Sequence, residues 1–432
     1  MQPTAIFFSR YRAFKEEVRV NLPPLTLIIG KNGGGKSILT RLPLLIAGGL
    51  AQQAESPIDL SAGNVRHAAR YEDLVHQRSA QPFMLGAEIS DGTTVWQFRT
   101  TLRHMVENHA LAFEKFELFE GGTALLTLTL ATPEDLGRKD GEFALVRHGA
   151  PDAAVRGVAF IGLFPRGITD QPEASEVLAR VRIGFERAFR APAYLGPFRS
   201  EQGATGRVPR QGVQTLGPRG EGALDLLGDN SLRNDGELMR SVEEWFDRAM
   251  DGNRIIIDGG GGIPRLLVRD RAHNIDVELA ETGAGFAQVL PIIVQIFGND
   301  QGHLVNSLSI FEQPDLHLHP AAHGSVADLF VQSVKGGTQS RYLCETHSEQ
   351  FITRIRRRIA EGELSPEAVQ IISVGHQSAE DSEPEPLRVV KIDRFGNVDA
   401  WPIGVFDEAF DDLVALREAA AKRETAEQGN GT

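Results

Sequence analysis

Apolar and polar residues at the beginning of the chain are arranged in a way that predicts three strands and a helix. Residues 4–9 (TAIFFS) and 17–22 (EVRVNL) are predicted to be short strands, and 25–29 (LTLII) a compact buried strand. The last strand leads directly into GKNGGGKS at 30–37 and then into the helical stretch 38–50.

The middle of the chain is predicted to contain several different kinds of element. Strand-like pieces over 82–131, split by Asp-Gly and Gly-Gly turns, predict an antiparallel meander, and 174–189 predicts a helix. Residues 196–236 are rich in Gly, Arg, Pro and Gln, which predicts a loop or a partly disordered insertion. A helix is predicted at 237–250. The stretch 255–268 (IIIDGGGGIPRLLV) predicts a hairpin rather than a phosphate cradle, because no Lys-Ser/Thr follows its glycines.

The last third of the chain is predicted to alternate between strands and helices over 275–405, which favours a parallel sheet. A charged, Ala-rich helix with a frayed end is predicted after about residue 412. The fold class is therefore α/β, with a parallel or mixed sheet core, an antiparallel β-meander and a compact middle insertion. The predicted parts are an N-terminal lobe, an Arg/Gly-rich middle insertion, a C-terminal lobe and a tail, at 1–150, 151–274, 275–412 and 413–432.

Composition narrows the class of protein. The 432 residues are 41% hydrophobic and 24% charged, as in an ordinary globular protein. The longest apolar run near the N-terminus, 38–51, contains Thr40 and Arg41 and is too short to span a membrane. The N-terminus lacks the pattern of a signal peptide, and the single cysteine, Cys344, excludes disulfide scaffolds and cysteine-based zinc sites. We therefore expect a cytoplasmic protein without a membrane partner.

Charge gives a weaker constraint. The formal net charge of −13 and the pI near 5.5 argue against a general nucleic-acid coat, which is usually basic. Locally, 181–220 carries seven Arg and no Lys against two acids, and 354–358 carries four more Arg. Both clusters fit either solvated surface or contacts with phosphate or an acidic partner.

Residues 30–37 carry the strongest chemical signal. GKNGGGKS fits G-x-x-x-x-G-K-[ST] between a buried strand and a helix, which is the context this motif requires. Its glycines let backbone N–H groups curl around the β-phosphate of a nucleotide. Lys36 supplies charge to the β and γ oxygens, and the Ser37 hydroxyl ligates magnesium. The residues expected to hold ATP here are Gly30, Asn32, Gly33, Gly34, Gly35, Lys36 and Ser37.

Two strand ends add polar candidates. Leu308–Glu312 is an apolar strand that ends in an acid, and Glu312 is the natural candidate for a magnesium ligand. The strand at 341–345 leads to His347, which can hydrogen-bond a γ-phosphate or can be merely structural. His317 and His319 alternate and suggest a metal pair, but no third ligand has the right spacing.

A second glycine-rich helix start lies at 281–288 (ETGAGFAQ), before the helical stretch 289–297. Thr282, Gly283 and Gly285 place exposed N–H donors there, either as an anion site or as an ordinary helix cap. One nucleotide seldom needs two such sites in one chain, unless the second serves a neighbouring subunit.

These motifs, in this order, resemble the ATP-binding-cassette (ABC)-type ATPase heads of the SMC/RecF class, and within it the ATPases of the "overcoming lysogenisation defect" type. GKNGGGKS matches the Walker A motif, and TGAGFAQ resembles the signature motif. EQPDLHLHP is similar to a Walker B motif running into the D-loop, and ETHS to the switch-histidine loop. The stretches YLGPFR (194–199) and VVKIDRFGNVDAWPIGVFDE resemble a bacterial family of predicted ATPases with a C-terminal domain of unknown function. The resemblance implies a P-loop NTPase of the ABC head type.

The resemblance also implies that two heads pair head to tail, as a homodimer or part of a higher homo-oligomer. Each ATP would lie between Lys36 of one subunit and Thr282–Gly285 of the other. A Gln that contacts Mg²⁺ is implied as well; Gln77 is the candidate and His76 its rival. SMC proteins carry long coiled coils, whereas 150–275 is compact, which argues against chromosome tethering.

The same resemblance bears on partners. Some relatives append a metal-dependent nuclease domain, but about 85 residues follow His347, so we expect a separately encoded effector, a nuclease or a toxin. Regulation of that effector in defence against phage or foreign DNA is an expectation by analogy. The alternative is a RecF-like repair ATPase that binds nucleic acid through the arginines of 181–220.

The pair Glu312-Gln313 raises a question of mechanism, because the resemblance implies Asp-Glu at these positions. Gln313 can orient a water molecule but cannot accept its proton, and losing a general base typically costs ~10²–10⁴-fold in rate. Three outcomes stay open: Glu345 or Asp315 substitutes as the base, hydrolysis is slow and ATP clamps the dimer, or ATP is only sensed.

Overall fold

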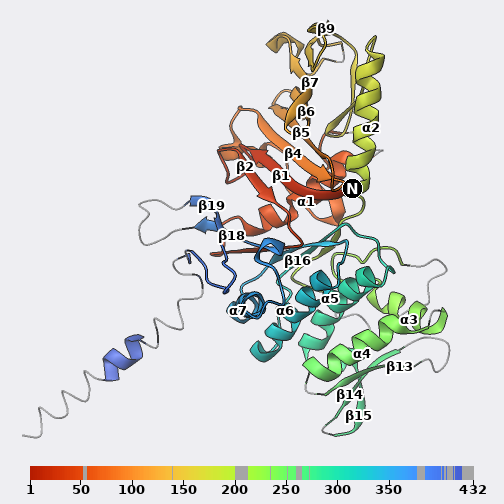
Figure 1. The fold of residues 1–432 in the computed structure, drawn as a ribbon, viewed down its shortest axis with the longest axis vertical. Coiled ribbons are helices and arrows are strands. Elements are labelled where there is room, and N and C mark those ends of the chain that lie inside the picture. The colour runs from red at the N-terminus through yellow and green to blue at the C-terminus, as the bar shows by residue number, and fades with distance from the viewer. Residues whose placement is uncertain are drawn as a thin grey trace, which may run out of the picture.

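The computed structural model describes residues 1–51, 56–138, 140–199, 213–233, 235–250, 252–258, 265–271, 273–376, 385–399, 401–402, 405, 412 and 414–420. The molecule is elongated: a large antiparallel sheet lies at one end, a parallel sheet crosses the middle, and a helical layer with a small sheet lies at the other end (Figure 1).

The antiparallel sheet contains the meander predicted from the sequence. Its strands are β1 (Gln2–Ser9), β2 (Val18–Asn21), β4 (Phe83–Ser90), β5 (Val95–Met105), β6 (Ala110–Glu120), β7 (Thr123–Leu130), β8 (Phe143–Arg147) and β9 (Ala153–Val155), in the order β2-β1-β4-β5-β6-β7-β8-β9. Buried and partly exposed positions alternate along β5 and β6, as expected for strands with one face on a core.

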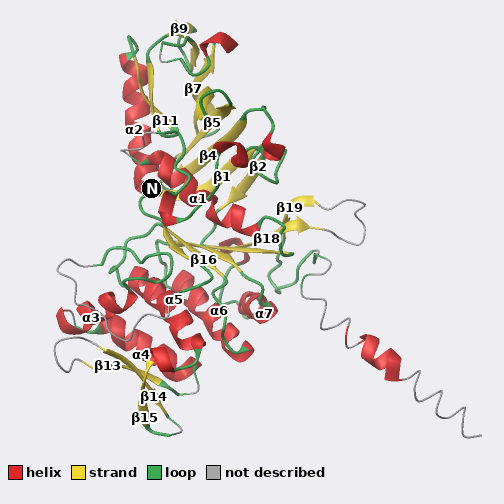
Figure 2. Ribbon diagram, turned by 180° about the vertical axis from the view of Figure 1, so that it is seen from behind, coloured by secondary structure: helices red, strands yellow, loops and turns green. Residues whose placement is uncertain are grey.

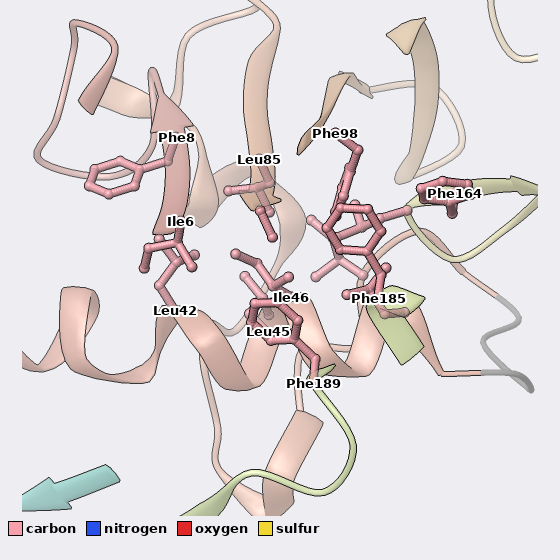
Figure 3. Packing of buried hydrophobic residues seen from close by; sticks show 14 of the residues in the cluster. Ile6, Phe8, Leu42, Leu45, Ile46, Leu85, Phe98, Phe164, Phe185 and Phe189 are labelled. Carbon is pink, nitrogen blue, oxygen red and sulfur yellow. The ribbon is translucent and has the colours of Figure 1, made fainter. Parts of the chain in front are cut away.

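Helix α2 (Pro172–Ala188) covers the apolar face of this sheet, together with the hairpin of β10 (Val158–Ile161) and β11 (Phe164–Ile168). Phe98 of β5 meets Phe185 of α2 and Phe164 of β11, with ring centroids 4.9 and 5.6 Å apart. Figure 3 shows these rings beside Leu45 and Ile46 of α1 (Lys36–Leu50). The helix after GKNGGGKS is therefore packed against the antiparallel sheet.

The central sheet is mostly parallel, as predicted. Its strands are β12 (Ala193–Leu195), β16 (Leu308–Glu312), β17 (Arg341–Glu345), β3 (Leu25–Gly30), β18 (Val369–His376) and β19 (Glu385–Val390), in that spatial order, and only β19 pairs antiparallel. Helices α6 (Pro320–Lys335) and α7 (Glu349–Ala360) connect β16 to β17 and β17 to β18.

Both faces of the central sheet are covered, so its inner strands β3 and β16 are buried at every position. Along β3, Ile28 packs into the core that α1 shares with the antiparallel sheet, whereas Leu27 and Ile29 pack into the core formed with α5 (Ala284–Asp300), α6 and α7. Figure 2 shows these three helices gathered on one side of the sheet.

Sheet order decides which strand ends are neighbours. Strand β17 lies between β3 and β16, so the strand after which the glycine-rich loop begins is separated from the strand that ends in Glu312 by the strand that ends in Glu345. Glu312 and Glu345 are directly opposite in the parallel register. Both carboxylates therefore lie at the carboxyl ends of the parallel strands, where the glycine-rich loop follows β3.

One expectation for the middle of the chain was wrong. Residues 196–236 were expected to form a loop or insertion without regular structure, but α3 (Ala223–Arg233) forms within them. Ala223, Leu224 and Leu227 recur at helical spacing and are buried against α4 (Glu237–Ala249) and α5. This burial offsets the conformational entropy lost when the segment becomes ordered. Residues 200–212 lie outside the described part.

The other elements agree with the sequence. β13 (Arg254–Asp258) and β14 (Arg265–Asp270) pair antiparallel, as the hairpin prediction requires, and β15 (Ile275–Glu278) joins them; the glycines between the two strands lie outside the described residues. Residues 414–420 are helical. The division at 150, 274 and 412 stays a prediction. Strand β12, from the predicted insertion, nevertheless pairs with β16 in the central sheet.

Candidate functional site

The loop from β3 to α1 has the backbone shape that its glycines permit. Gly30 has a φ of 141°, and a Cβ there would lie 2.3 Å from the carbonyl oxygen of Val374 in β18, so a side chain is excluded. Gly35, with a φ of 100°, precedes the first residue of α1 and provides no side-chain cap. The first turn of α1 contains no acidic residue. Its N–H groups are therefore suited to an anion from outside the chain.

Of the other loop residues, Asn32 and Gly33 are exposed, and Gly34 donates from its N–H to the carbonyl oxygen of Lys31 at 3.2 Å. Lys36 is only 4% exposed, and its ammonium donates to the carbonyl oxygens of Gly30 at 2.9 Å and Lys31 at 2.8 Å. An ammonium has three donors, so these bonds leave capacity for a phosphate oxygen. Burial lowers the pKa of Lys36, while the charge of Glu345 opposes that shift.

Ser37 contacts Glu345 rather than Glu312. Its hydroxyl donates to the Glu345 carboxylate, with Oγ 2.9 Å from Oε2 and 3.2 Å from Oε1. Thr40 Oγ1 lies 3.2 Å from the same Oε2 atom and 2.9 Å from the carbonyl oxygen of Lys36. Burial, followed by the charge of Glu312, raises the pKa of Glu345. Three oxygen-bearing side chains thus converge beside the lysine of the loop.

Glu312 forms an ion pair with Arg41 of α1. Arg41 Nε lies 2.5 Å from Oε1 and Nη2 lies 2.7 Å from Oε2, so both carboxylate oxygens accept from the guanidinium. The hydrogen bonds to Glu312 raise the pKa of Arg41. The guanidinium carbon also lies 5.8 Å from the ring centroid of Tyr194. Sequence reasoning missed Arg41, Thr40 and Tyr194, because each depends on a partner far along the chain.

Gln313 begins a turn directly after β16. Its φ of 48° is left-handed, which is uncommon for a residue other than glycine. Its N–H donates to the carbonyl oxygen of Glu345 at 2.7 Å, so the turn is joined to β17. Asp315 follows and is buried, and the Thr346 hydroxyl donates to it at 2.5 Å. Asp315 is therefore tied to the loop that carries His347.

His347 is exposed at the end of β17. Partial burial of the imidazole ring lowers the pKa of His347, and the positive charge of Lys36 lowers it further. The negative charge of Asp315 opposes both effects. His347 lies two residues after β17, the neighbour of β3, which leads into the glycine-rich loop. Its contact with a γ-phosphate stays a prediction.

The helix start of α5 is open to solvent. Gly283 is exposed, and a Cβ there would meet no atom within 4 Å. Gly285 lies close to the backbone of His317, whose carbonyl oxygen would be 3.0 Å from an added Cβ. Thr282 does not cap the helix; its hydroxyl donates to the carbonyl oxygen of Leu279 at 2.7 Å. The N–H groups of this helix start are thus available to a ligand or a partner.

The two exposed histidines, His317 and His319, do not form a metal site. His319 Nδ1 accepts from the N–H of Ala321 at 3.3 Å and so caps α6. Among the described residues there is no group of three or more His, Cys, Asp or Glu side chains that could hold a metal ion. Cys344 is fully buried, as expected for an inert thiol.

Gln77 is exposed and has a left-handed φ of 54°. Its neighbour His76 contacts the turn between β1 and β2: the backbone N–H donates to the carbonyl oxygen of Arg10 at 2.7 Å, and ring Nδ1 lies 2.7 Å from the carbonyl oxygen of Arg12. That turn includes Ala13, whose Cβ would be 3.9 Å from a Cβ on Gly35. The segment of Gln77 therefore contacts a turn that lies against the loop, and its magnesium contact stays a prediction.

The arginine clusters are mostly engaged within the chain. Arg354 and Arg358 both form ion pairs with Asp328, and Arg357 pairs with Glu361. In the other cluster, Arg182 pairs with Glu186, and Arg199 is 3% exposed. Arg207 and Arg210 lie outside the described residues. The interpretation of 354–358 as an internally paired helix surface is therefore favoured over a phosphate contact.

Similarity to a known family is found in the C-terminal part of the chain. Residues 364–416 match a family model described as a protein of unknown function (DUF3696), which agrees with the resemblance of the C-terminal stretch. A comparison with curated proteins found no match. Within the described residues, no helix is long and apolar enough to cross a membrane.

Several solved structures are similar in fold. An SMC head bound to the C-winged helix domain of ScpA matches with 13% identity and a TM-score of 0.49, over 91% of this chain and 99% of that chain. The SMC head domain from Thermotoga maritima matches with 10% identity and a TM-score of 0.44, over 91% and 100%. An Smc head with an extended coiled coil, bound to a ScpA domain derived from Pyrococcus furiosus, matches with 12% identity and a TM-score of 0.44, over 96% and 99%.

Proposed function

We propose that this protein is an ATPase that binds ATP with Mg²⁺ and hydrolyses it slowly. The observation that carries the proposal is the hydrogen bond from Ser37, next to Lys36 at the start of α1, to Glu345, which lies directly opposite Glu312 at the ends of two neighbouring parallel strands. A glycine-rich loop that opens into a helix favours phosphate groups through its N–H donors. Lys36 has donor capacity left for the terminal phosphates.

The side chains beside the loop fit magnesium. Ser37 and Thr40 place their hydroxyl oxygens within 3.2 Å of the Glu345 carboxylate, and hard divalent cations prefer oxygen ligands. Burial raises the pKa of Glu345, so the ionised carboxylate would gain from a nearby cation. Ser37 and Glu345 would therefore hold the ion, and Glu312 would join them only when its pair with Arg41 opens. Magnesium supplies neutralisation of the phosphate charge.

The slow rate follows from Gln313. Its amide can aim a water molecule but cannot take its proton. Glu312 is held by Arg41 on both oxygens, which makes it a poor proton acceptor while the pair persists. Phosphoryl transfer depends strongly on positioning and charge neutralisation, so part of the rate is retained without a dedicated base.

Bound ATP is proposed to hold two heads together as a sandwich dimer. The support is the open helix start at Thr282–Gly285, which has N–H donors but no side-chain cap within the described chain. The phosphates of an ATP held by the partner would satisfy these donors. Opening and closing of the dimer would regulate a separate effector, with defence against foreign DNA as the context by analogy.

The test is nucleotide binding and assembly in the same samples. The purified protein is titrated with a fluorescent ATP analogue and Mg²⁺, and its mass is measured by light scattering with and without ATP. We expect saturable binding and an ATP-dependent dimer. Lys36→Ala should weaken binding by about 30-fold or more, because truncating one partner of a buried charged contact costs about 2–5 kcal/mol.

Lys335→Ala is the matched control, because Lys335 lies at the end of α6 and pairs with Glu363 at the surface. It should bind ATP like the wild type. Wild-type protein that binds no ATP, or Lys36→Ala protein that binds it equally well, would refute the proposal. Cleavage of DNA by the purified protein alone would refute the separate effector.

A further inference from the structure

The stretch Tyr194–Arg199 (YLGPFR) contributes to the site as a ring, Tyr194, beside Arg41, but its last residue, Arg199, has a further set of contacts. It begins in β12, which runs parallel to β16 with Leu195 opposite Phe311. The chain therefore leaves β12 at the same edge of the sheet at which Glu312 lies. Four residues later it reaches Arg199, whose side chain is almost fully buried at 3% exposure.

Arg199 contacts the turn after β16 through its guanidinium. Nη2 donates to the carbonyl oxygen of Glu312 at 2.8 Å and to that of Gln313 at 3.0 Å. Glu312 and Gln313 are the two residues whose side chains are considered for activating water in the proposed hydrolysis. Gln313 has the left-handed φ of 48°. One cationic group therefore holds the backbone on both sides of that strained position.

Arg199 also contacts α5, the helix whose start is open to solvent. Nη1 donates to the carbonyl oxygen of Gln288 at 3.2 Å. The Gln288 side chain forms two hydrogen bonds with the backbone of Arg199. Oε1 accepts from the N–H of Arg199 at 3.1 Å, and Nε2 donates to the carbonyl oxygen of Arg199 at 2.7 Å. Gln288 is buried one turn after Ala284, the first residue of α5.

Burying the charged guanidinium of Arg199 in this arrangement costs free energy. The three guanidinium contacts all go to backbone carbonyl oxygens, and Nε is buried without a hydrogen-bond partner among the described residues. Burial lowers the pKa of Arg199 to about 10, so the side chain stays charged at neutral pH. A planar fork can contact carbonyl groups on two elements at once, which the single ammonium of a lysine does less well.

We propose that Arg199 is a positioning residue that locks the turn Glu312-Gln313 to the first turns of α5. The turn belongs to the nucleotide site of the same subunit, and the start of α5 is the surface proposed to meet the partner's ATP. Through Arg199 and Gln288 the two move as one unit. Closure of the dimer at α5 thereby fixes the backbone that aims the Gln313 amide.

The first test needs no nucleotide. Hydrogen–deuterium exchange is measured on the wild type, Arg199→Lys and Gln288→Ala. In Arg199→Lys, exchange should speed up by about tenfold or more in both 284–292 and 312–318, because local opening loses charge-assisted hydrogen bonds. In Gln288→Ala, 284–292 should respond more than 312–318, because the contacts of Arg199 with Glu312 and Gln313 remain.

Arg341→Lys is the matched control. Arg341 is also partly buried and donates to the carbonyl oxygen of Leu22, but it lies at the opposite end of β17. It should leave both segments unchanged. Wild-type exchange in both segments of Arg199→Lys, or an equal acceleration over the entire central sheet, would overturn the proposal.

The second test rests on the proposed function. Arg199→Lys should lower kcat for ATP by about 10- to 100-fold, as small misplacements of a reacting geometry do, with KM changed by less than about threefold. A change in KM alone would overturn the positioning role. If the wild type hydrolyses no ATP, the proposed function fails by itself, and hydrogen exchange still decides the role of Arg199.

Discussion

Glu312 and Glu345 occupy matching positions at the ends of neighbouring strands, yet their partners differ. Glu345 accepts from the hydroxyl of Ser37, next to Lys36, whereas Glu312 is bound at both oxygens by Arg41. A carboxylate beside the Walker A serine suits a magnesium site, and a carboxylate in a two-point ion pair suits a structural or switching role. In this structure the residue best placed for metal is therefore Glu345.

The identity of residue 313 is predicted to limit the rate of ATP turnover. Gln313→Glu restores a proton acceptor to a turn whose backbone is already held by Arg199 and β17. Turnover should rise by about 100-fold, the lower end of the ~10²–10⁴-fold range that a general base contributes. The measurement is steady-state phosphate release at saturating ATP and Mg²⁺, compared with ATP binding on the same preparations.

Glu345→Gln is the companion variant. It should weaken the binding of Mg²⁺. The Mg²⁺ concentration needed for half-maximal binding of the fluorescent ATP analogue should therefore rise. Unchanged turnover in Gln313→Glu, together with complete loss in Glu345→Ala, would contradict the slow-clamp mechanism. Glu345 would then be the base.

Sequence spacing could identify the loop residues because they are contiguous and their geometry is local. Gly30 to Ser37 fit one motif between a strand and a helix, and the structure has that loop. Arg41 and Arg199 could not be found in this way, because their partners are 271 and 113 residues away. Such contacts depend on the order of strands in the sheet, which no local pattern records.

At the scale of elements, apolar periodicity predicted most strands and helices. It worked for β3, whose six positions are all buried, and for α2, with its amphipathic spacing. It missed α3, because a long Gly- and Arg-rich stretch precedes the few leucines that bury it. The placement of β17 against β3 was also not predicted, and this placement brings Glu345 to Ser37.

The start of α5 is predicted to serve the partner's nucleotide rather than its own fold. Gly283→Asp adds a carboxylate at a position with a φ of −58° and no atom within 4 Å of the new Cβ. Aspartate is a slightly better N-cap than glycine, so stability should be unchanged or raised by about 0.3 kcal/mol. The charge should repel the γ-phosphate, so the ATP-dependent dimer should be lost while monomers still bind ATP. Light scattering and analogue titration measure the two properties.

Gly283→Ser is the neutral control, because serine also caps a helix but carries no charge. It should dimerise with ATP much more readily than Gly283→Asp. Dimerisation of Gly283→Asp at wild-type ATP concentrations would show that this helix start does not face a phosphate.

At the scale of the whole molecule, two cores lie on opposite faces of the central sheet. One joins the sheet and α1 to the antiparallel sheet, and the other joins it to α3–α7. The proposed nucleotide site lies at the edge of the sheet that the two cores share, so both hold its residues: α1 positions Lys36 and Arg41 from one side, and α5 positions Gln288 from the other.

The aromatic cluster of Phe98, Phe164 and Phe185 in the antiparallel core is predicted to contribute stability without shaping the site. Phe185 of α2 is fully buried, with its ring centroid 4.9 Å from that of Phe98 and 5.9 Å from that of Phe164. Phe185→Ala should lower the free energy of unfolding by about 3–5 kcal/mol, the usual effect of removing a buried aromatic ring. Urea unfolding followed by circular dichroism measures this loss.

ATP affinity at low temperature should stay at the wild-type value in Phe185→Ala, because the folded molecules keep Lys36, Ser37 and Glu345 in place. Val146→Ala, on β8 of the same sheet and 46% exposed, is the control and should change stability by less than about 0.5 kcal/mol. A fall in ATP affinity with Phe185→Ala, under conditions where circular dichroism shows the protein folded, would mean that packing against α2 is transmitted through α1 to the loop.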